Sequence, residues 1–203
     1  MSKTVYFILG SIGSGKSEVA KRLLCSEKFE EIIYIGSDAC KYKYFNQENV
    51  EKRGYRCADE LAFMMMREAC KNGQSFMYEL CPTNRNKIES IKNLIMDNNY
   101  ATIGFFVGTD NVQTNISRVK QRASNGKDSV LEEKIKIRYN DALGRIPELL
   151  YITDILYFID NSSTKDDMHV VSRHKKGVFE VYDDSCNWFN KVRTQITASR
   201  MVQ

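Results

Sequence analysis

The sequence predicts a single α/β domain built on a parallel sheet of about five strands with helices on its faces. Two observations support this prediction. Short apolar runs alternate along the chain with longer amphipathic segments, which is the pattern of strands joined by crossover helices. The first apolar run also ends in a glycine-rich turn that leads directly into a helical segment.

In the first half of the chain, apolar runs define the strands and amphipathic periodicity defines the helices. The expected strands are 4–10, 30–38 and 75–80, and the expected helices are 14–29, 57–73 and 84–99. Gly73 suits the C-cap of the second of these helices. The pattern over 41–56 is compatible with either a helix or a loop.

The second half continues the alternation and then departs from it. Strands are expected over 100–108 and 153–162, with helices over 111–126 and 130–151 between them. Residues 169–182 then suggest a strand pair around Lys175-Lys176-Gly177, and 185–196 suggest a terminal helix. We therefore expect one domain over 1–203, with a core of about 4–163 and a small C-terminal extension of about 164–203.

The composition narrows the class of protein. The chain has 203 residues, 42% hydrophobic and 28% charged, as expected of an ordinary globular domain. A net charge of +4 is too small to indicate nucleic acid as the partner. The six cysteines form no C-x-x-C pair, so packed thiols are expected rather than a metal or disulfide framework. The apolar run after MSK is too short for a signal peptide or a membrane span, so we expect a cytoplasmic protein without a membrane partner.

The stretch GSIGSGKS matches the phosphate-loop pattern G-x-x-x-x-G-K-[ST] in its required context, after a strand and before a helix. Glycines let the backbone wrap a phosphate, so that successive N–H groups face the anion. Lys16 is expected to reach the β- and γ-phosphates of ATP, and the Ser17 hydroxyl to hold Mg²⁺. The predicted nucleotide-binding residues are Gly10, Ser11, Ile12, Gly13, Ser14, Gly15, Lys16 and Ser17.

Three carboxylates follow other strands, at the edge where ligands of parallel sheets bind. Asp38 is placed to accept the proton of an attacking hydroxyl, or else to cap the helix that follows. Glu79 lies at the end of an apolar run that is expected to be a buried strand. It is expected to orient Mg²⁺, to bind a hydroxyl of the acceptor, or to make a purely structural link to the next loop. Asp160, in DNSS, borders the adenine and ribose or forms a turn.

Four arginines are candidates for binding the transferred phosphate or the acceptor. Arg118 and Arg122 are four residues apart in a polar helix expected to form a lid, with a solvated face as the alternative. Arg85 follows Glu79 closely and either binds an anionic acceptor or solvates a helix start. Arg138 points either to the site or to a surface carboxylate.

With these residues assembled, the chain resembles the zeta toxin-like branch of the P-loop kinases over about Val5 to Ser163. The likeness rests on GSIGSGKS, IGSD, YELCPTNRNKI, FFVGTDNVQTNISRVKQRASNG and IKIRYNDALGRIPELLYITDILYFIDNSS. The last two stretches are the most specific, because the loop alone is common to many NTPases. The resemblance implies a P-loop NTPase-type sheet with a helical lid.

The resemblance also implies roles for individual residues. Asp38 would be the catalytic base and Glu79 the acidic contact to the acceptor. Arg118 and Arg122 would stabilise the transferring phosphoryl group, beside the triphosphate bound through Lys16. Family toxins phosphorylate UDP-N-acetylglucosamine and are restrained by a small antitoxin. This chain departs from the toxins after Glu79, where LCPTN replaces the Gly-Thr that commonly precedes an arginine.

The sequence therefore predicts an ATP- and Mg²⁺-dependent kinase with catalytic residues Lys16, Asp38, Arg118 and Arg122. The expected acceptor is a small hydroxylated molecule bound by Asp38, Glu79 and Arg85, and the resemblance implies a UDP-sugar such as UDP-N-acetylglucosamine. One rival is a 5′-hydroxyl polynucleotide or nucleoside kinase. A strand-binding channel needs basic and aromatic side chains, and KYKYF (41–45) is the only short stretch that interleaves them. The other rival is a non-catalytic nucleotide switch or ATPase, which would not need Asp38.

Overall fold

The structure is a computed structural model that describes residues 3–29, 31–44, 47–126, 128–163 and 167–201. The strands are β1 (Thr4–Gly10), β2 (Ile33–Ile35), β3 (Phe76–Leu80), β4 (Ala101–Gly108), β5 (Ile155–Asp160), β6 (His169–Lys175) and β7 (Val178–Val181). The helices are α1 (Lys16–Leu24), α2 (Ser37–Tyr44), α3 (Gln47–Lys71), α4 (Arg85–Asp97), α5 (Val112–Ser124), α6 (Glu132–Gly144), α7 (Ile146–Ile152) and α8 (Asn187–Met201), with a 3-10 turn, η1, at Glu27–Phe29.

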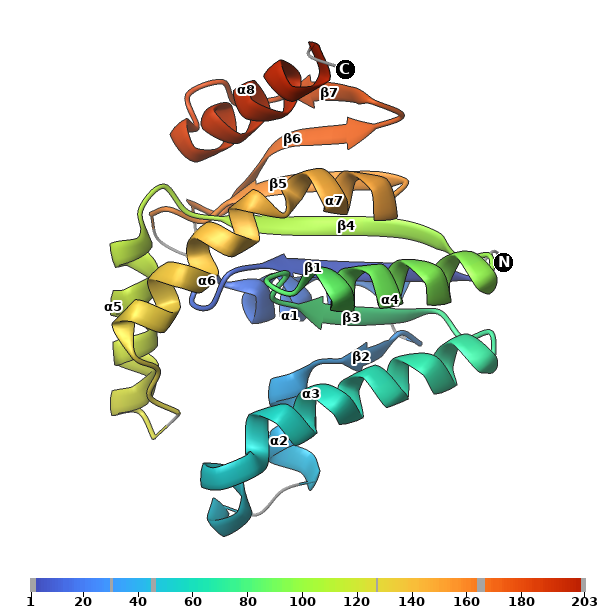
Figure 1. The fold of residues 1–203 in the computed structure, drawn as a ribbon, viewed down its shortest axis with the longest axis vertical. Coiled ribbons are helices and arrows are strands. Elements are labelled where there is room, and N and C mark those ends of the chain that lie inside the picture. The colour runs from blue at the N-terminus through green and yellow to red at the C-terminus, as the bar shows by residue number, and fades with distance from the viewer. Residues whose placement is uncertain (1–2, 30, 45–46, 127, 164–166, 202–203) are drawn as a thin grey trace.

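The described strands form one seven-stranded sheet in the order β2-β3-β1-β4-β5-β6-β7 (Figure 1). The pairs from β2 to β5 are parallel, whereas β6 and β7 are added antiparallel beside β5. This confirms the predicted α/β class with its parallel core, and the predicted strand pair extends the same sheet. The carboxyl ends of β1 to β5 therefore meet at one edge, where ligands of such sheets bind.

Three predicted elements differ in extent from what the sequence suggested. β2 is shorter than 30–38, because the chain turns into α2 at Ser37. The undecided region 41–56 is helical in α2 and α3, apart from 45–46, which lie outside the described residues. The helix expected over 130–151 is two helices, and Pro147 stands in the first turn of α7. Proline lacks an N–H for a continuous helix but suits a first turn.

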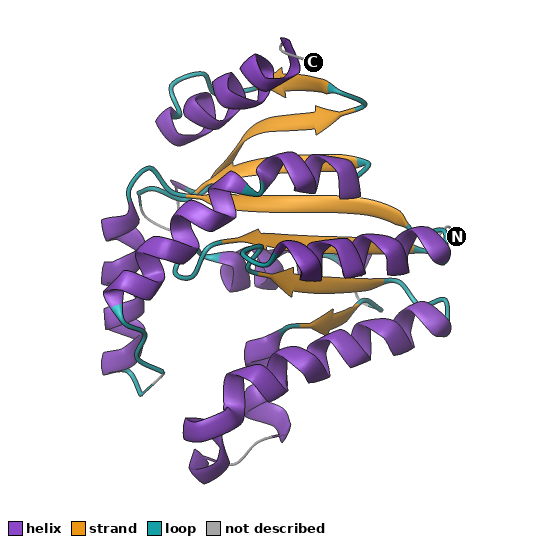
Figure 2. Ribbon diagram, in the orientation of Figure 1, coloured by secondary structure: helices purple, strands orange, loops and turns teal. Residues whose placement is uncertain are grey.

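Helices cover the two faces of the sheet unequally (Figure 2). On β1, Val5, Phe7 and Leu9 are fully buried in a large core shared with α3, α4, α7 and α8. The alternate residue Ile8 faces α1 and lies in a smaller cluster with Val19. Alternation along β1 thus places the helix that follows the glycine-rich loop on the opposite face from the main core.

The C-terminal residues contribute to the main core. On α8, Trp188 is 3% exposed and Phe189 is fully buried against Phe158, with ring centroids 5.0 Å apart. The indole of Trp188 lies against Gly108, where a Cβ would come within 2.4 Å of the ring. Its Nε1 donates to Asp160 Oδ1 at 2.7 Å. The extension is therefore packed onto β4 and β5 close to the edge where those strands end.

No helix in the described part of the chain is both long and apolar enough to cross a membrane.

Candidate functional site

The loop between β1 and α1 adopts a conformation that needs glycine. Gly13 and Gly15 have φ values of 76° and 103°, in the left-handed region that side chains rarely adopt. A Cβ at Gly13 would lie 2.6 Å from the backbone oxygen of Asn115, and one at Gly15 would lie 2.2 Å from Asn161 Nδ2. The glycines of GSIGSGKS thus let two neighbouring segments approach the loop closely.

Two asparagines hold the loop from those segments. Asn115, fully buried on α5, donates to Ser11 Oγ at 2.8 Å and to the Ile12 carbonyl at 2.7 Å. Asn161, just after β5, donates to the Ser14 carbonyl at 2.7 Å. Sequence reasoning missed both residues, because their burial depends on where α5 and β5 lie relative to β1. The two asparagines therefore hold the loop from both sides by donating hydrogen bonds to its backbone carbonyls.

Lys16 is the first residue of α1, and its side chain lies back over the loop. Its Nζ donates to the Ser11 carbonyl at 2.9 Å and is 3.9 Å from Glu79 Oε1. The side chain is only 9% exposed, so its charge faces the loop rather than bulk water. An ammonium group held against a glycine-rich loop at the start of a helix is suited to binding phosphate groups.

Ser17 and Glu79 are brought together by the pairing of β1 with β3. Ile8 pairs with Glu79 in the parallel register, so the carboxylate reaches the start of α1. Ser17 Oγ donates to Glu79 Oε2 at 3.1 Å, and the hydroxyl of Tyr34, from β2, donates to the same oxygen. A hydroxyl with a carboxylate is the limited protein ligand set that Mg²⁺ uses beside nucleotide phosphates. The described residues contain no cluster of three or more His, Cys, Asp or Glu that could hold a metal ion.

Asp38 lies opposite an arginine from the predicted lid. It occupies the first turn of α2 and not the end of β2, because Ser37 already begins the helix. Asp38 therefore stands past the N-cap position that was its structural alternative. Its Oδ2 is 3.3 Å from Nη2 of Arg122, and both side chains are 42% exposed. The structure thus joins two of the residues predicted to act on the transferred phosphoryl group.

Arg118 has different partners from Arg122, although both lie on α5. Its Nη1 and Nη2 donate to the carbonyls of Asn161 at 2.9 Å and Ser163 at 2.8 Å. Partial burial lowers the pKa of its guanidinium group. These bonds attach α5 to the segment after β5, while Arg122 reaches α2. The two arginines therefore do not converge on one point in this structure.

The other candidate residues lie at the margin of the site. Arg85 is exposed in the first turn of α4, where Asn84 caps the helix by accepting from the Lys87 N–H at 3.2 Å. Arg138 is exposed on α6. Burial raises the pKa of the Cys81 thiol, and the positive charge of Arg138 partly opposes that rise. Asp160 accepts from Trp188 and from Ser162 Oγ, so it forms the turn that was one of its two predicted roles.

A second ion pair joins α2 to the segment after α5, and sequence reasoning missed it. Lys41 Nζ contacts Asp128 Oδ2, with the lysine side chain 2% exposed. Lys41 follows Asp38 by almost one helical turn, so both face the segment that carries Arg122 and Asp128. Two ion pairs therefore connect α2 to the predicted lid, and α2 supplies the acidic partner of one and the basic partner of the other.

Comparison with known proteins shows what this arrangement has in common with others. No family model and no curated protein matches the sequence. A chain of the AvrRxo1-ORF1:ORF2 complex with ATP matches with a TM-score of 0.67 at 12% identity, over 94% of this chain and 63% of that chain. A chain of the PezAT chromosomal toxin–antitoxin system of Streptococcus pneumoniae matches with a TM-score of 0.61 at 12% identity, over 98% of this chain and 88% of that chain.

A gluconokinase from Sinorhizobium meliloti 1021 also matches, with a TM-score of 0.51 at 12% identity over 80% of this chain and 85% of that chain. At such identities the likeness shows the fold. This confirms the fold expected from the resemblance to zeta toxin-like P-loop kinases. This chain spans just under two thirds of the length of its AvrRxo1 match.

Proposed function

We propose that this chain is an ATP- and Mg²⁺-dependent kinase that transfers the γ-phosphate to a hydroxyl of a small molecule. The observation that carries the proposal is the arrangement at the end of β1. The braced glycine loop, the Lys16 ammonium group and the Ser17–Glu79 pair lie together there, opposite Asp38 and Arg122. The kinase fold of the matching structures supports the same reading.

ATP binding is assigned to the loop and its surroundings. The backbone N–H groups of Gly10 to Ser17 and the Lys16 ammonium group face the phosphates. The segment after β5, held by Arg118, borders the base and ribose. In this assignment Arg118 positions the nucleotide, and Arg122 is the arginine left to stabilise the transferred group.

The Ser17 hydroxyl and the Glu79 carboxylate would hold Mg²⁺, since a hydroxyl and a carboxylate are oxygen ligands that the ion accepts beside nucleotide phosphates. When bound, the ion neutralises charge that develops on the phosphate oxygens during transfer. Glu79 lies close to Lys16 and Ser17, which favours the metal-orienting role over the acceptor-binding role among those predicted for it.

The transfer step assigns one role to each remaining group. The acceptor hydroxyl oxygen bonds to the γ-phosphorus while the bond from that phosphorus to the β–γ bridging oxygen breaks, and ADP leaves. The hydroxyl proton passes to a carboxylate oxygen of Asp38. Arg122, which contacts Asp38 in this structure, turns to the γ-phosphate oxygens as charge spreads over them. Its exchange of partners is therefore part of closing the site.

The acceptor is proposed to be a nucleotide sugar such as a UDP-sugar, on the resemblance to zeta toxins. A gluconokinase is among the matching structures, so the proposal extends to smaller hydroxylated metabolites as well. An antitoxin partner and a cytoplasmic location are part of the same proposal. The toxin–antitoxin system among the matching structures supports the partner.

The rival functions are less well supported by the described residues. A polynucleotide kinase needs free basic and aromatic groups along a channel. In KYKYF, however, the Lys41 side chain is buried and paired with Asp128. A nucleotide switch has no need for a carboxylate at the position of Asp38, which faces an arginine of the predicted lid.

The proposal is tested by ³¹P NMR of the protein with ATP, Mg²⁺ and a panel of acceptors. The panel contains UDP-sugars, simple sugars and sugar acids, nucleosides and a 5′-hydroxyl oligonucleotide. A new phosphomonoester signal that Lys16→Ala abolishes supports a kinase and names the acceptor class. Tight ATP binding with neither transfer nor hydrolysis would instead support the switch.

A further inference from the structure

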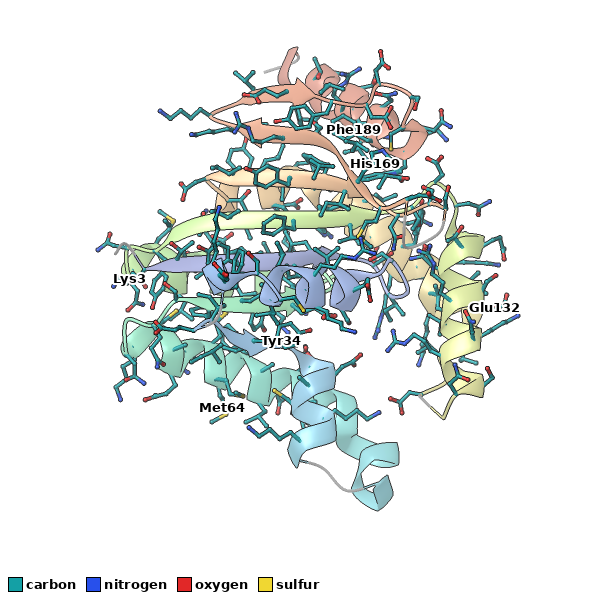
Figure 3. All side chains as sticks on the ribbon, turned by 180° about the vertical axis from the view of Figure 1, so that it is seen from behind. Lys3, Tyr34, Met64, Glu132, His169 and Phe189 are labelled. Atoms are coloured by element: carbon teal, nitrogen blue, oxygen red, sulfur yellow. The ribbon has the colours of Figure 1, made fainter. Side chains whose placement is uncertain are left out.

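Tyr34 reaches the catalytic edge from β2, the outer parallel strand of the sheet. It pairs with Met77 of β3 in the parallel register. Glu79 lies two residues beyond Met77 and so projects from the same face. Tyr34 packs with Met77 in the cluster on the α1 side, and Figure 3 shows it on that side of the molecule. The length of the tyrosine side chain then carries its hydroxyl to the end of the strand.

The hydroxyl of Tyr34 and that of Ser17 converge on one carboxylate oxygen. Both donate to Glu79 Oε2, from Ser17 at 3.1 Å. The other oxygen, Oε1, faces Lys16 Nζ at 3.9 Å. Two donors on Oε2 fix the rotation of the carboxylate plane, and they leave Oε1 turned toward the lysine that faces the phosphates.

The surroundings of Tyr34 preserve this hydrogen bond. Gly36 makes room for it, because a Cβ there would lie 3.1 Å from the Tyr34 hydroxyl and 3.4 Å from Glu79 Cβ. The phenol hydroxyl can therefore approach the Glu79 carboxylate closely and donate to it.

A purely structural explanation for this contact is that the Tyr34 hydroxyl supplies a hydrogen bond to the mostly buried carboxylate of Glu79, whose side chain is 14% exposed. Lys16 and Ser17 already approach that carboxylate, however, and both belong to the phosphate-binding loop. The Tyr34 hydroxyl is the donor to Glu79 that comes from outside the loop and its helix. It can hold the carboxylate while Ser17 turns its hydroxyl toward a ligand.

We propose that Tyr34 is a positioning residue, whose hydroxyl holds Glu79 in the orientation that binds Mg²⁺ together with Ser17. This inference rests on the proposed function, since it assigns Glu79 to the metal that accompanies ATP. In this role Tyr34 acts on the metal through Glu79. Partners that orient metal ligands in this way commonly change metal affinity by about 10- to 100-fold.

The test measures Mn²⁺ binding, with Mn²⁺ as a spectroscopic substitute for Mg²⁺, by electron paramagnetic resonance of the protein with ATP. Tyr34→Phe removes only the hydroxyl. Tyr100→Phe is the matched control, because the Tyr100 hydroxyl donates to backbone carbonyls of Ala69 and Gln74, away from the loop. We expect Tyr34→Phe to weaken Mn²⁺ binding by about 10-fold, with the affinity for ATP in EDTA unchanged. Tyr100→Phe should leave Mn²⁺ binding unchanged.

A double variant shows whether Tyr34 acts through Glu79. Glu79→Gln should weaken Mn²⁺ binding, and adding Tyr34→Phe to it should cause no further loss. Unchanged Mn²⁺ affinity in Tyr34→Phe, or full additivity with Glu79→Gln, would overturn the inference even if the protein is a kinase. Absence of transfer to every acceptor, with Mn²⁺ affinity still dependent on Tyr34, would overturn the kinase proposal and keep this one.

Discussion

At the scale of single residues, the contact between Asp38 and Arg122 links the predicted base to the predicted phosphate-binding arginine. Their separation of 3.3 Å and their exposed fractions of 42% describe a solvated pair, which costs little to separate. An incoming triphosphate and acceptor can therefore part the two side chains. The pair therefore contributes little to stability, which fits the catalytic roles proposed for both side chains.

Replacing Asp38 by Asn should lower the rate of phosphoryl transfer by roughly 10²-fold or more, because the amide cannot accept the hydroxyl proton. ATP affinity should change little, since Asp38 contacts no residue of the phosphate loop among the described hydrogen bonds. Single-turnover measurements at saturating ATP separate the two quantities. An unchanged rate would leave Asp38 only the role of holding Arg122.

The two arginines of α5 should give different kinetic defects. Arg122→Ala should slow transfer by roughly 10³-fold at saturating ATP, the scale of a lost transition-state arginine. Arg118→Ala should mainly weaken ATP binding, because it detaches α5 from the carbonyls of Asn161 and Ser163. ATP titrations followed by transfer rates distinguish the defects. If both variants slow transfer equally at saturating ATP, Arg118 also stabilises the transferred phosphoryl group, which is the role predicted for it from the sequence.

At the scale of elements, the strands and most helices could be predicted because their signals are local. Apolar runs gave β1, β3, β4 and β5, and the residues of GSIGSGKS defined the turn between β1 and α1. The break before α7 was missed although Pro147 was visible, since the amphipathic pattern continues across it.

The side chains that complete the site were not predictable in the same way. Tyr34, Asn115 and Asn161 meet the loop only because of strand order and register, which depend on pairings between distant segments. Nothing in the apolar run around Tyr34 distinguishes it from a packed aromatic residue. Local patterns therefore indicated the chemistry of the site but not the side chains that hold it in place.

The start of β6 is attached to the turn before α8 by a pair that depends on pH. His169 Nε2 is 2.9 Å from Asp183 Oδ2. Hydrogen bonds to the Asp167 carbonyl and to Asp183 raise the pKa of His169, while bonds from Ser185 and His169 lower that of Asp183 to about 2. The protonated imidazole is thus favoured in the folded state over the unfolded chain.

This linkage gives a pH-dependent stability with a defined sign. The contribution of His169 should be fully present below about pH 6.5, the unfolded value, and should be lost as pH rises through the raised folded pKa. Denaturant unfolding of wild type and His169→Gln at a series of pH values measures it. The difference between the two proteins should shrink toward alkaline pH. A constant difference would show that the imidazole contributes only as a neutral hydrogen-bonding group.

At the scale of the whole molecule, the C-terminal helix and the strands that carry the candidate site share one hydrophobic core. Phe189 is fully buried among Phe158, Phe179 and Trp188, so the segment after about residue 163 packs as part of the sheet's main core. We propose that the chain folds as the single domain predicted over 1–203, with the C-terminal extension of about 164–203 packed as part of its core.

Phe189→Ala tests this cooperation. Truncating a fully buried phenylalanine should lower the free energy of unfolding by about 3–5 kcal/mol, with a single transition. Denaturant unfolding monitored by circular dichroism provides the measurement, and Val178→Ala, at a 62% exposed position on β7, is the control that should change little. Two separate transitions would show that the C-terminal segment unfolds independently.

Trp188 is the single tryptophan of the chain, and its place in the fold makes it an intrinsic fluorescent probe. Its indole is buried against Gly108 and bonded to Asp160, which directly precedes the Asn161 that holds the phosphate loop. Emission from this one fluorophore therefore reports two events. Undocking of α8 should shift it to longer wavelength, whereas a nucleotide entering the loop should change its intensity without unfolding. Binding and stability can thus be followed on the unlabelled protein with a single spectroscopic signal.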